Sequence, residues 1–485
     1  MFLPLGLLIK KINMKRSLYI YIFTFITLLS FSCSKMVEGL NDNPNQPSST
    51  SPDLLLTGLQ LGTVTFHSGQ LSRHAGLLSG YFKGTDRQYQ TFYNYMIINA
   101  NFNTHWANAY RIIRNAYTLE QLAKEDNREG VIVGISKVLA AHTMGTIAAL
   151  WGDVPFREAG RYVEFNNPQY DAQLEVYEGV QNMLNDAIES LRSPVGRPVA
   201  NADVFFDGNP EKWIKVAYSL KARFYLHLGE YEQALANAKL GIISPSDNWL
   251  ADFFVDELNG ENLYEQFYRG NRAGDLETSG TYFYELLSPS GAHYRGDLKT
   301  NETARFNYLV RTEGNRAVNN TTSSGAFGAT SSYPLFTFEE NLLILAESAF
   351  HQEGFNSALE YLNELREYYS SGAHIGSNYH SLGFLYEPYF ANDFSPGGIA
   401  SYPNLSQEDN LLRKILEEKY VLTYSSVEGF NDLRRVFGEP YAMEIPTNNG
   451  NRQPQRFLYP QSELDRNVNI PKEIPNLYDK TPANE

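Results

Sequence analysis

The clearest pattern of hydrophobic and polar positions lies in residues 209–243. Asn209, a residue type that caps helix N-termini, precedes Pro210, and hydrophobic side chains then recur at steps of three and four residues. The apolar face of this first helix comprises Trp213, Ala217, Leu220, Phe224 and Leu228. Gly229 ends it, and a second amphipathic helix follows at once. Such a pair is typical of a tetratricopeptide-like unit, which needs neighbours because it cannot bury both of its faces alone.

The same pattern returns in residues 338–365, where Gly354 separates two amphipathic helices. In the second helix of each pair, an aromatic residue precedes an alanine by the same number of positions. These residues are Tyr231 and Ala234 in the first pair, and Phe355 and Ala358 in the second. This self-similarity predicts a helical-repeat protein.

Other segments also show helical periodicity. They are residues 54–78, about 104–124, about 130–150, 173–191 and 407–425. The regularity fails in two aromatic-rich stretches, residues 244–333 and 372–405, and stretches of this length are usually inserted functional lobes. The tail after residue 438 is expected to be coil. The predicted fold is therefore mainly α, a tetratricopeptide-like helical-repeat scaffold with two irregular, aromatic-rich lobes.

The N-terminal segment has the pattern of a bacterial lipoprotein signal. Lys15 and Arg16 precede an apolar run over residues 18–31, which is short for a membrane span, and Cys33 follows a small residue. We expect Cys33 to become the lipidated first residue of the mature protein; the alternative is a short membrane helix with an incidental cysteine. Because Cys33 is the only cysteine, intrachain disulfides and cysteine-based metal sites are excluded.

These features divide the chain into three parts. Residues 1–32 are the expected signal peptide, with Met14 as the expected start because residues 1–13 only add a second apolar stub. Residues 33–53 are the lipidated cysteine and a tether rich in Pro, Asn and Ser. Residues 54–485 are expected to form one domain that includes both lobes.

Composition narrows the class of partner. The formal net charge is −15 and there is no basic run, which argues against nucleic acid as a ligand. Aromatic residues make up 14% of the chain, with 33 tyrosines and 29 phenylalanines. Tyrosine suits hydrated binding surfaces because its ring is apolar and its tip is polar, although a tyrosine-rich core is an equally good explanation of any single residue.

No sequence motif indicates catalysis. Nucleophile elbows, phosphate-binding loops and dinucleotide fingerprints do not occur, and the nine histidines lack the spacing of a zinc hydrolase. We therefore predict a non-enzymatic protein without metal or cofactor. A hydrolase with carboxylates unmarked by spacing stays an alternative. Aromatic faces beside Asn, Asp and Arg favour sugar rings, but a peptide would use similar surfaces.

Five motifs occur in order along the chain. They are Trp-Gly-Asp-Val-Pro-Phe at 151–156, Asn-Pro-Glu-Lys-Trp with Leu-Lys-Ala-Arg at 209–223, Glu-Glu-Asn-Leu-Leu-Ile-Leu-Ala-Glu at 339–347, Gly-Phe-Asn-Asp-Leu-Arg-Arg at 429–435, and Tyr-Pro-Gln-Ser-Glu at 459–463. With Cys33 and its Asn-Pro-Asn tether, they resemble the SusD/RagB family of outer-membrane nutrient-binding lipoproteins of Bacteroidetes, and most nearly its SusD-like branch. The resemblance covers nearly all of the mature chain.

The resemblance implies a mainly α, tetratricopeptide-like superhelix of four units, with a variable, irregular, aromatic-rich lobe packed on it. It also implies a non-catalytic role, in which a lipid-anchored protein on the surface of the outer membrane captures oligosaccharide or peptide. The partner implied is a TonB-dependent, SusC-like porin, which the protein would cover as a lid. A periplasmic tetratricopeptide adaptor that binds only protein is the remaining alternative.

Ligand residues vary within this family, so no motif transfers them to this chain. Our candidates are aromatic and arginine side chains of the irregular stretch 244–333 and of an aromatic-rich loop region that we expect after residue 78, with ordinary packing as the alternative for each. They are Tyr89, Tyr93, Trp249, Tyr268, Arg272 and Tyr294. Arg434 and Arg435, which follow Asp432, are expected instead to brace buried carboxylates.

Overall fold

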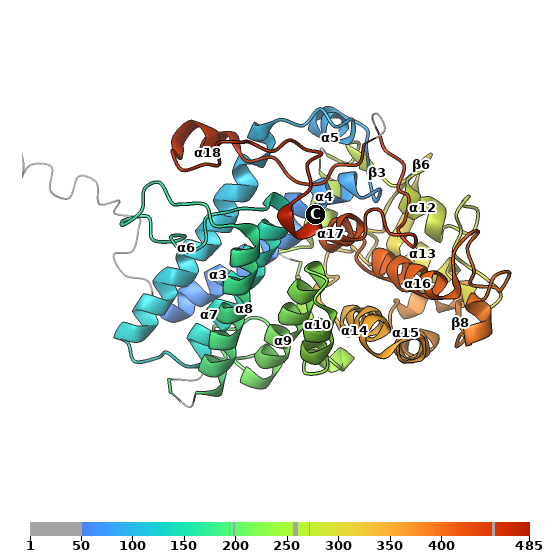
Figure 1. Ribbon diagram of the computed structural model, residues 1–485, viewed down its shortest axis with the longest axis horizontal. Helices are drawn as coiled ribbons and strands as arrows, with labels where there is room; N and C mark the ends of the chain where they lie inside the picture. The colour runs from blue at the N-terminus through green and yellow to red at the C-terminus, as the bar shows by residue number, and fades with distance from the viewer. Residues whose placement is uncertain (1–50, 194, 197–198, 256–259, 271, 449–451) are drawn as a thin grey trace, which may run out of the picture. The chain divides into compact units, whose positions relative to one another are not determined.

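The long helices pack against their sequence neighbours from α6 through α10 and on to α14 and α15 (Figure 1). The computed structural model describes residues 51–193, 195–196, 199–255, 260–270, 272–448 and 452–485. Within them, Pro52–Glu485 forms one compact unit. The signal peptide predicted over residues 1–32 and the lipidation predicted at Cys33 lie outside the described residues.

The predicted helices are present, although the one expected over residues 54–78 is divided in two, and the helix over residues 428–435 was not among those predicted. The long ones are α3 (Pro52–Ser68), α6 (Asn103–Glu125), α7 (Val131–Trp151), α8 (Gln173–Arg192), α9 (Pro210–His227), α10 (Tyr231–Ala238), α14 (Phe338–Glu353), α15 (Phe355–Ser370), α16 (Gln407–Leu422) and α17 (Glu428–Arg435). The two predicted helix pairs are α9 with α10 and α14 with α15, and α10 packs directly on α14. The mainly α, tetratricopeptide-like fold is thereby confirmed.

Local chemistry explains where these helices begin and end. The Asn209 side chain accepts hydrogen bonds from the backbone N–H groups of Glu211 and Lys212, which caps α9. Gly229, after α9, and Gly354, after α14, have φ of 68° and 95°, in the left-handed region that favours glycine.

The helix predicted over residues 54–78 is divided in two. α3 ends at Ser68, and α4 (Gln70–Leu78) begins after Gly69. Gly69 has ψ of −137°, far from a helical value, and a Cβ added there would lie 2.4 Å from the Thr65 carbonyl oxygen. The hydrophobic periodicity continues across this break, so periodicity alone did not reveal it.

Both stretches predicted to be irregular, residues 244–333 and 372–405, contain short helices or turns, and strands. The short helices here and elsewhere in the chain are α5 (Arg87–Tyr93), α11 (Leu263–Arg269), α12 (Tyr282–Leu287), α13 (Thr303–Leu309), α18 (Gln461–Arg466) and the 3-10 turns Asn99–Phe102, Pro245–Asp247, Ser377–Leu382, Ala391–Phe394 and Pro482–Asn484. The tail after residue 438, predicted to be coil, thus includes α18. It also includes the 3-10 turn Pro482–Asn484.

Each strand pairs with one antiparallel partner. The pairs are β1 (Lys83–Gly84) with β3 (Leu276–Glu277), β2 (Trp249–Ala251) with β7 (Tyr333–Phe336), β4 (Thr300–Asn301) with β8 (Leu385–Tyr386), and β5 (Val310–Glu313) with β6 (Arg316–Asn319). The β2–β7 pair joins the entry and the exit of the first lobe, with Trp249 opposite Phe336. The β4–β8 pair ties the second aromatic-rich stretch to the first.

α7 is apolar on all sides. Among the described residues it is the one helix long and apolar enough to cross a bilayer, but 89% of that apolar window is buried inside the protein. Neighbouring helices α6 and α8 pack against it. Burial in the core therefore accounts for its composition.

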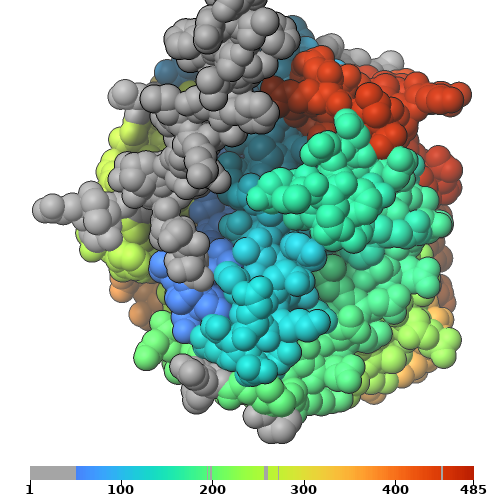
Figure 2. Space-filling view, turned by 90° about the vertical axis from the view of Figure 1, so that its left-hand side faces the viewer, coloured from blue at the N-terminus to red at the C-terminus, as the bar shows by residue number. Residues whose placement is uncertain are grey.

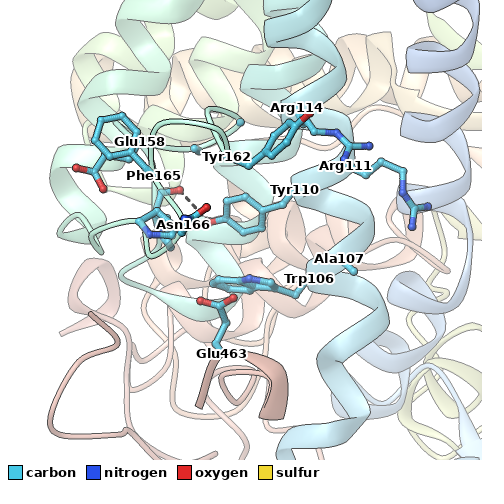
Figure 3. A pocket seen from close by; sticks show the side chains of 14 residues that line it. Trp106, Ala107, Tyr110, Arg111, Arg114, Glu158, Tyr162, Phe165, Asn166 and Glu463 are labelled. Atoms are coloured by element: carbon cyan, nitrogen blue, oxygen red, sulfur yellow. Dashed lines mark hydrogen bonds between the residues drawn. The ribbon is translucent and has the colours of Figure 1, made fainter. Parts of the chain in front are cut away.

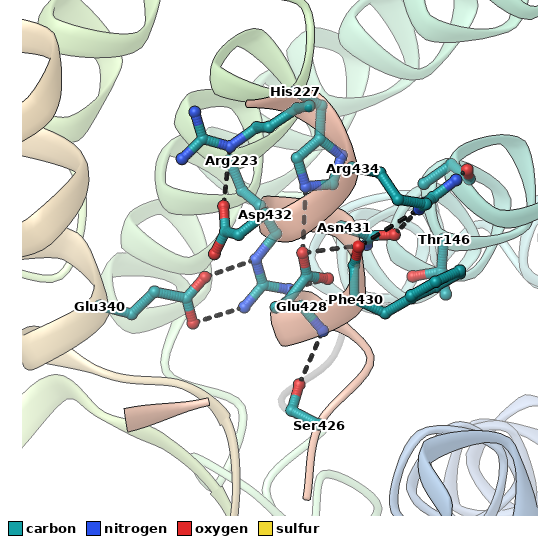
Figure 4. Close-up of polar contacts among 12 residues, drawn as sticks. Thr146, Arg223, His227, Glu340, Ser426, Glu428, Phe430, Asn431, Asp432 and Arg434 are labelled. Atoms are coloured by element: carbon teal, nitrogen blue, oxygen red, sulfur yellow. Dashed lines mark hydrogen bonds and ion pairs between the residues drawn. The ribbon is translucent and has the colours of Figure 1, made fainter. Parts of the chain in front are cut away.

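A buried polar network joins the helices that carry the sequence motifs (Figure 4). Arg223 of α9 forms two hydrogen bonds of 2.7 Å with the Glu340 carboxylate of α14. His227 of α9 contacts Glu428 of α17 at 3.0 Å. Burial alone would raise the pKa of the Glu428 carboxyl, but Arg223 and His227 beside it hold that pKa well below its usual value.

The two arginines of α17 have different roles. Arg435 pairs with Glu347 and Asp432, which confirms the prediction that it braces buried carboxylates. Arg434 is also buried, but it donates to the carbonyl oxygens of Gln455 and Ala149 and to the Asn431 side chain. The prediction of a carboxylate partner is therefore wrong for Arg434. Its guanidinium instead satisfies backbone carbonyls that would otherwise be buried without donors.

Candidate ligand-binding site

Four of the six predicted ligand residues lie around α5 and α11. Tyr89 and Tyr93 belong to α5, Tyr268 belongs to α11, and Arg272 follows α11. The Arg272 guanidinium lies over the Tyr89 ring at 5.5 Å, and Phe267 of α11 contacts the same ring edge to face at 5.3 Å. We call these four predicted residues the α5–α11 cluster.

Most of the aromatic surface of the α5–α11 cluster is internal. Tyr89 is 2% exposed and accepts a hydrogen bond from Arg73, while Tyr268 is 4% exposed and donates to Asn319. Burial raises the pKa of Tyr268, which keeps its hydroxyl protonated. Tyr93 and Arg272 are half-buried, so they are the members that reach the surface.

The other two predicted residues lie elsewhere. Trp249 is completely buried on β2, where its ring packs against Trp213 at 5.6 Å and Phe205 at 5.7 Å. It anchors the start of the lobe to the helices. Tyr294 is half-buried in the lobe, and its hydroxyl accepts a hydrogen bond from the Glu302 backbone N–H. Ligand contact by any of the six residues stays a prediction.

A more open site lies beside α6. A pocket of about 390 Å³ is bounded by α6, by the segment 155–168 that follows α7, and by α18 (Figure 3). We call it the α6 pocket. Its aromatic and polar lining comprises Trp106, Tyr110, Arg111, Arg114, Glu158, Tyr162, Phe165, Asn166 and Glu463. Figure 2 shows the face on which α6 (cyan), the segment 155–168 (green) and the C-terminal region (red) adjoin.

Helical spacing places the α6 side chains in the pocket. Trp106, Tyr110 and Arg114 follow one another at steps of four residues, so they lie on one face of α6. The segment 155–168 crosses this face and is held there because the Tyr110 hydroxyl donates to the Pro155 carbonyl oxygen at 2.8 Å. Gly160 makes the close approach possible, since a Cβ there would lie 3.3 Å from the Ile113 carbonyl oxygen.

Aromatic rings form one wall of the α6 pocket. The ring centroids of Trp106 and Tyr110 lie 4.9 Å apart, and the Trp106 ring also stacks on the Tyr170 ring, with the centroids 6.2 Å apart. At the rim, the Tyr162 side chain is 62% exposed, with the Arg114 guanidinium 5.6 Å from its ring centre. An exposed aromatic ring supported by a cation is suited to stacking against a ligand.

Carboxylates lie on the other sides of the pocket. Glu463 accepts hydrogen bonds from the Tyr170 hydroxyl and the Asn467 amide, both at 3.0 Å, and Glu158 accepts from the Gln169 backbone N–H. Burial raises the pKa of both Tyr110 and Tyr170, and the negative charge of the Glu463 carboxylate raises it further. Both phenols therefore remain hydrogen-bond donors. Among the described residues, no group of three His, Cys, Asp or Glu could hold a metal ion.

The arrangement can therefore hold a polar ring-shaped ligand. Apolar C–H faces would pack beside the exposed Tyr162 ring, because Trp106 is itself only 5% exposed. Hydroxyl groups would meet carboxylates, guanidinium groups and the Asn166 amide. Sequence reasoning missed this site because Trp106 and Tyr110 fit the hydrophobic face of a helix. The available signal was Arg114, which continues the same four-residue step with a charged side chain.

The fold is that of a helical-repeat protein with an aromatic-lined pocket on its surface. A family model for SusD-like proteins, described as starch-binding and associating with the outer membrane, matches residues 44–460. The chain therefore belongs to this SusD-like family. A comparison with curated proteins finds no match.

Solved structures show the same fold. A SusD/RagB family protein from Bacteroides thetaiotaomicron is 20% identical with a TM-score of 0.62, over 87% of this chain and 95% of that one. A SusD homologue from Bacteroides fragilis is 16% identical with a TM-score of 0.66, and the match covers 90% of this chain and 100% of that one. A chitin-binding SusD homologue from Flavobacterium johnsoniae is 16% identical with a TM-score of 0.60, and the match covers 85% of this chain and 92% of that one.

Proposed function

We propose that this protein binds oligosaccharide in the α6 pocket and delivers it to a TonB-dependent, SusC-like transporter of the outer membrane. Membership of a starch-binding family that associates with the outer membrane supports glycan binding and nutrient uptake in general. The observation that carries the proposal is the exposed ring of Tyr162 beside the hydrogen-bonding groups of the α6 pocket.

The proposal includes a lipid anchor at Cys33, exposure at the cell surface and the absence of catalysis. A multiply acylated cysteine would hold the domain on the membrane, because each buried CH₂ contributes about 0.8 kcal/mol. Co-purification from detergent-solubilised outer membranes should recover a TonB-dependent porin in near-equal amount. Recovery of this protein alone would contradict the proposed partnership.

Three alternatives share the same scaffold: peptide import, a lipid-anchored hydrolase and a protein-binding adaptor. A peptide ligand would rely on backbone hydrogen bonds and deeper pockets. The α6 pocket instead presents rings and side-chain groups, which favours sugar. For this reason we place glycan first.

The substitution Tyr162→Ala tests the site. It removes an exposed stacking surface, so binding of an oligosaccharide found by glycan array should weaken about tenfold, equivalent to about 1.4 kcal/mol. Isothermal titration calorimetry of the full-length protein in detergent measures this. Val163→Ala is the matched control, because Val163 is the next residue, is 81% exposed and does not line the pocket. Equal affinity of both variants and the unmodified protein would reject the α6 pocket as the site.

A further inference from the structure

Two arginines of the α6 pocket have no carboxylate partner among the described residues. Arg111 and Arg114 lie on adjacent turns of α6 and are both exposed. Arg111 donates to the Asn108 side chain at 3.2 Å, and Arg114 lies over the Tyr162 ring. By contrast, the nearby Arg157 forms ion pairs with acidic side chains. The charges of Arg111 and Arg114 are therefore available to a ligand.

The carboxylates of the pocket do not neutralise these two arginines. In Figure 3, Glu158 and Glu463 lie across the pocket from Arg111 and Arg114. Both carboxylates already accept hydrogen bonds from neutral donors of the protein. The pocket thus has a cationic end with unused donors and an opposite side with acceptors, and an aromatic wall lies between them.

We propose, resting on the proposed glycan function, that the α6 pocket selects sugars that carry a carboxylate, that is, uronate-containing oligosaccharides. The planar carboxylate pairs with the guanidinium groups of Arg111 and Arg114, whose forked donors fit it in a bidentate manner. The sugar ring packs beside Tyr162. Ring hydroxyls on the other side donate to Glu158 and Glu463.

The preference for acidic sugars must come from short-range contacts, because the protein as a whole is negatively charged. The chain carries a formal net charge of −15, which repels acidic polymers at long range. An arginine pair at the rim must therefore supply the attraction at short range, and salt will screen it because both side chains are exposed. Affinity for an acidic sugar should fall as ionic strength rises, whereas affinity for a neutral sugar should change little.

The test compares each acidic oligosaccharide with its own methyl ester. Oligomers of galacturonate, glucuronate and mannuronate, and their methyl esters, are titrated into the full-length protein in detergent. Esterification removes the charge and keeps the ring and hydroxyls. At least one acid should bind about tenfold more tightly than its ester, because its ion pairs are charge-assisted and bidentate. The variant with Arg111→Gln and Arg114→Gln should lose that difference.

The control is Lys124→Gln, which removes a positive charge from an exposed position of the same helix outside the pocket. It should keep the preference for the acid. Equal binding of every acid and its ester, or a preference that survives in the double variant, overturns the inference. Equally tight binding of tetra-aspartate overturns the assignment to sugars.

The outcomes also separate this inference from the proposed function. Binding of a neutral glycan through Tyr162, without any advantage for the acids, rejects the inference alone. Failure of every neutral and acidic glycan to bind rejects both.

Discussion

Arg223 and Glu340 form a buried ion pair between α9 and α14, with side chains 2% and 7% exposed. Arg223→Met should lower the free energy of unfolding by about 3–5 kcal/mol, because it leaves the Glu340 carboxylate buried without its partner. Urea denaturation measures this loss. Adding Glu340→Leu should recover part of it, since an apolar pair can replace a buried ion pair. The remainder reflects Glu428 and the Leu335 carbonyl oxygen, which also lose Arg223.

Arg192→Met is the control for that experiment, because Arg192 is exposed and, among the residues that the structure describes, contacts Tyr218 alone, at 3.5 Å. It should change stability by less than about 0.5 kcal/mol. A loss below about 1 kcal/mol for Arg223→Met would show that the pair does not hold the two helices together.

Four buried histidines make stability depend on pH. Burial, with help from nearby positive charge, lowers the pKa of His67 and His105 to about 3, and burial also lowers the pKa of His74 and His142. Below pH of about 6.5 the unfolded chain takes up protons that the folded protein excludes. The contribution of these histidines to the free energy of unfolding is therefore fully present above that pH. It is lost as the pH decreases from 6.5 towards 3.

The expected slope is about 1.4 kcal/mol per pH unit for each such histidine. Urea unfolding at pH 7.5, 6.0 and 5.0 measures it. His67→Gln should reduce the slope, because His67 stacks on His142 at 3.8 Å and contributes to the same buried group. A flat profile from pH 7.5 to 5.0 would contradict the account. Glu428, with its lowered pKa, adds a further loss as the pH falls below about 4.5.

At the scale of elements, the segment 155–168 forms one side of the α6 pocket. Gly160→Ala should weaken oligosaccharide binding severalfold and lower stability by about 1 kcal/mol, because φ at Gly160 is 79° and the added Cβ would press on α6. Calorimetric titration and urea denaturation measure the two effects. Gly58→Ala is the control, since a Cβ there meets nothing within 4 Å. Unchanged binding in the Gly160 variant would show that this segment does not shape the site.

The helices could be predicted because their signals are local. The Asn209 cap, Gly229 and Gly354 mark helix ends within a few neighbouring residues. The lobe could not be predicted in this way, because β2 and β7 are far apart in sequence and pair only after the chain folds. Trp249 shows the consequence: in an irregular stretch it looked like a ligand residue, but the β2–β7 pair places it in the core.

At the scale of the whole molecule, the α6 pocket combines three distant parts of the chain. Trp106 and Tyr110 come from α6, Tyr162 comes from the segment after α7, and Glu463 comes from α18. Each part has an ordinary explanation in the sequence, as a helix face, a loop or a tail. Only the packing of α6, the segment and α18 shows that they line one pocket, and for this reason the six residues predicted from the sequence do not include any of its lining.

The most direct test of the account is a crystal structure of the protein with a bound oligosaccharide. We expect a sugar ring in the α6 pocket, packed beside Tyr162 and within hydrogen-bond distance of Glu158 or Glu463. A sugar bound at the α5–α11 cluster, with the α6 pocket empty, would contradict it.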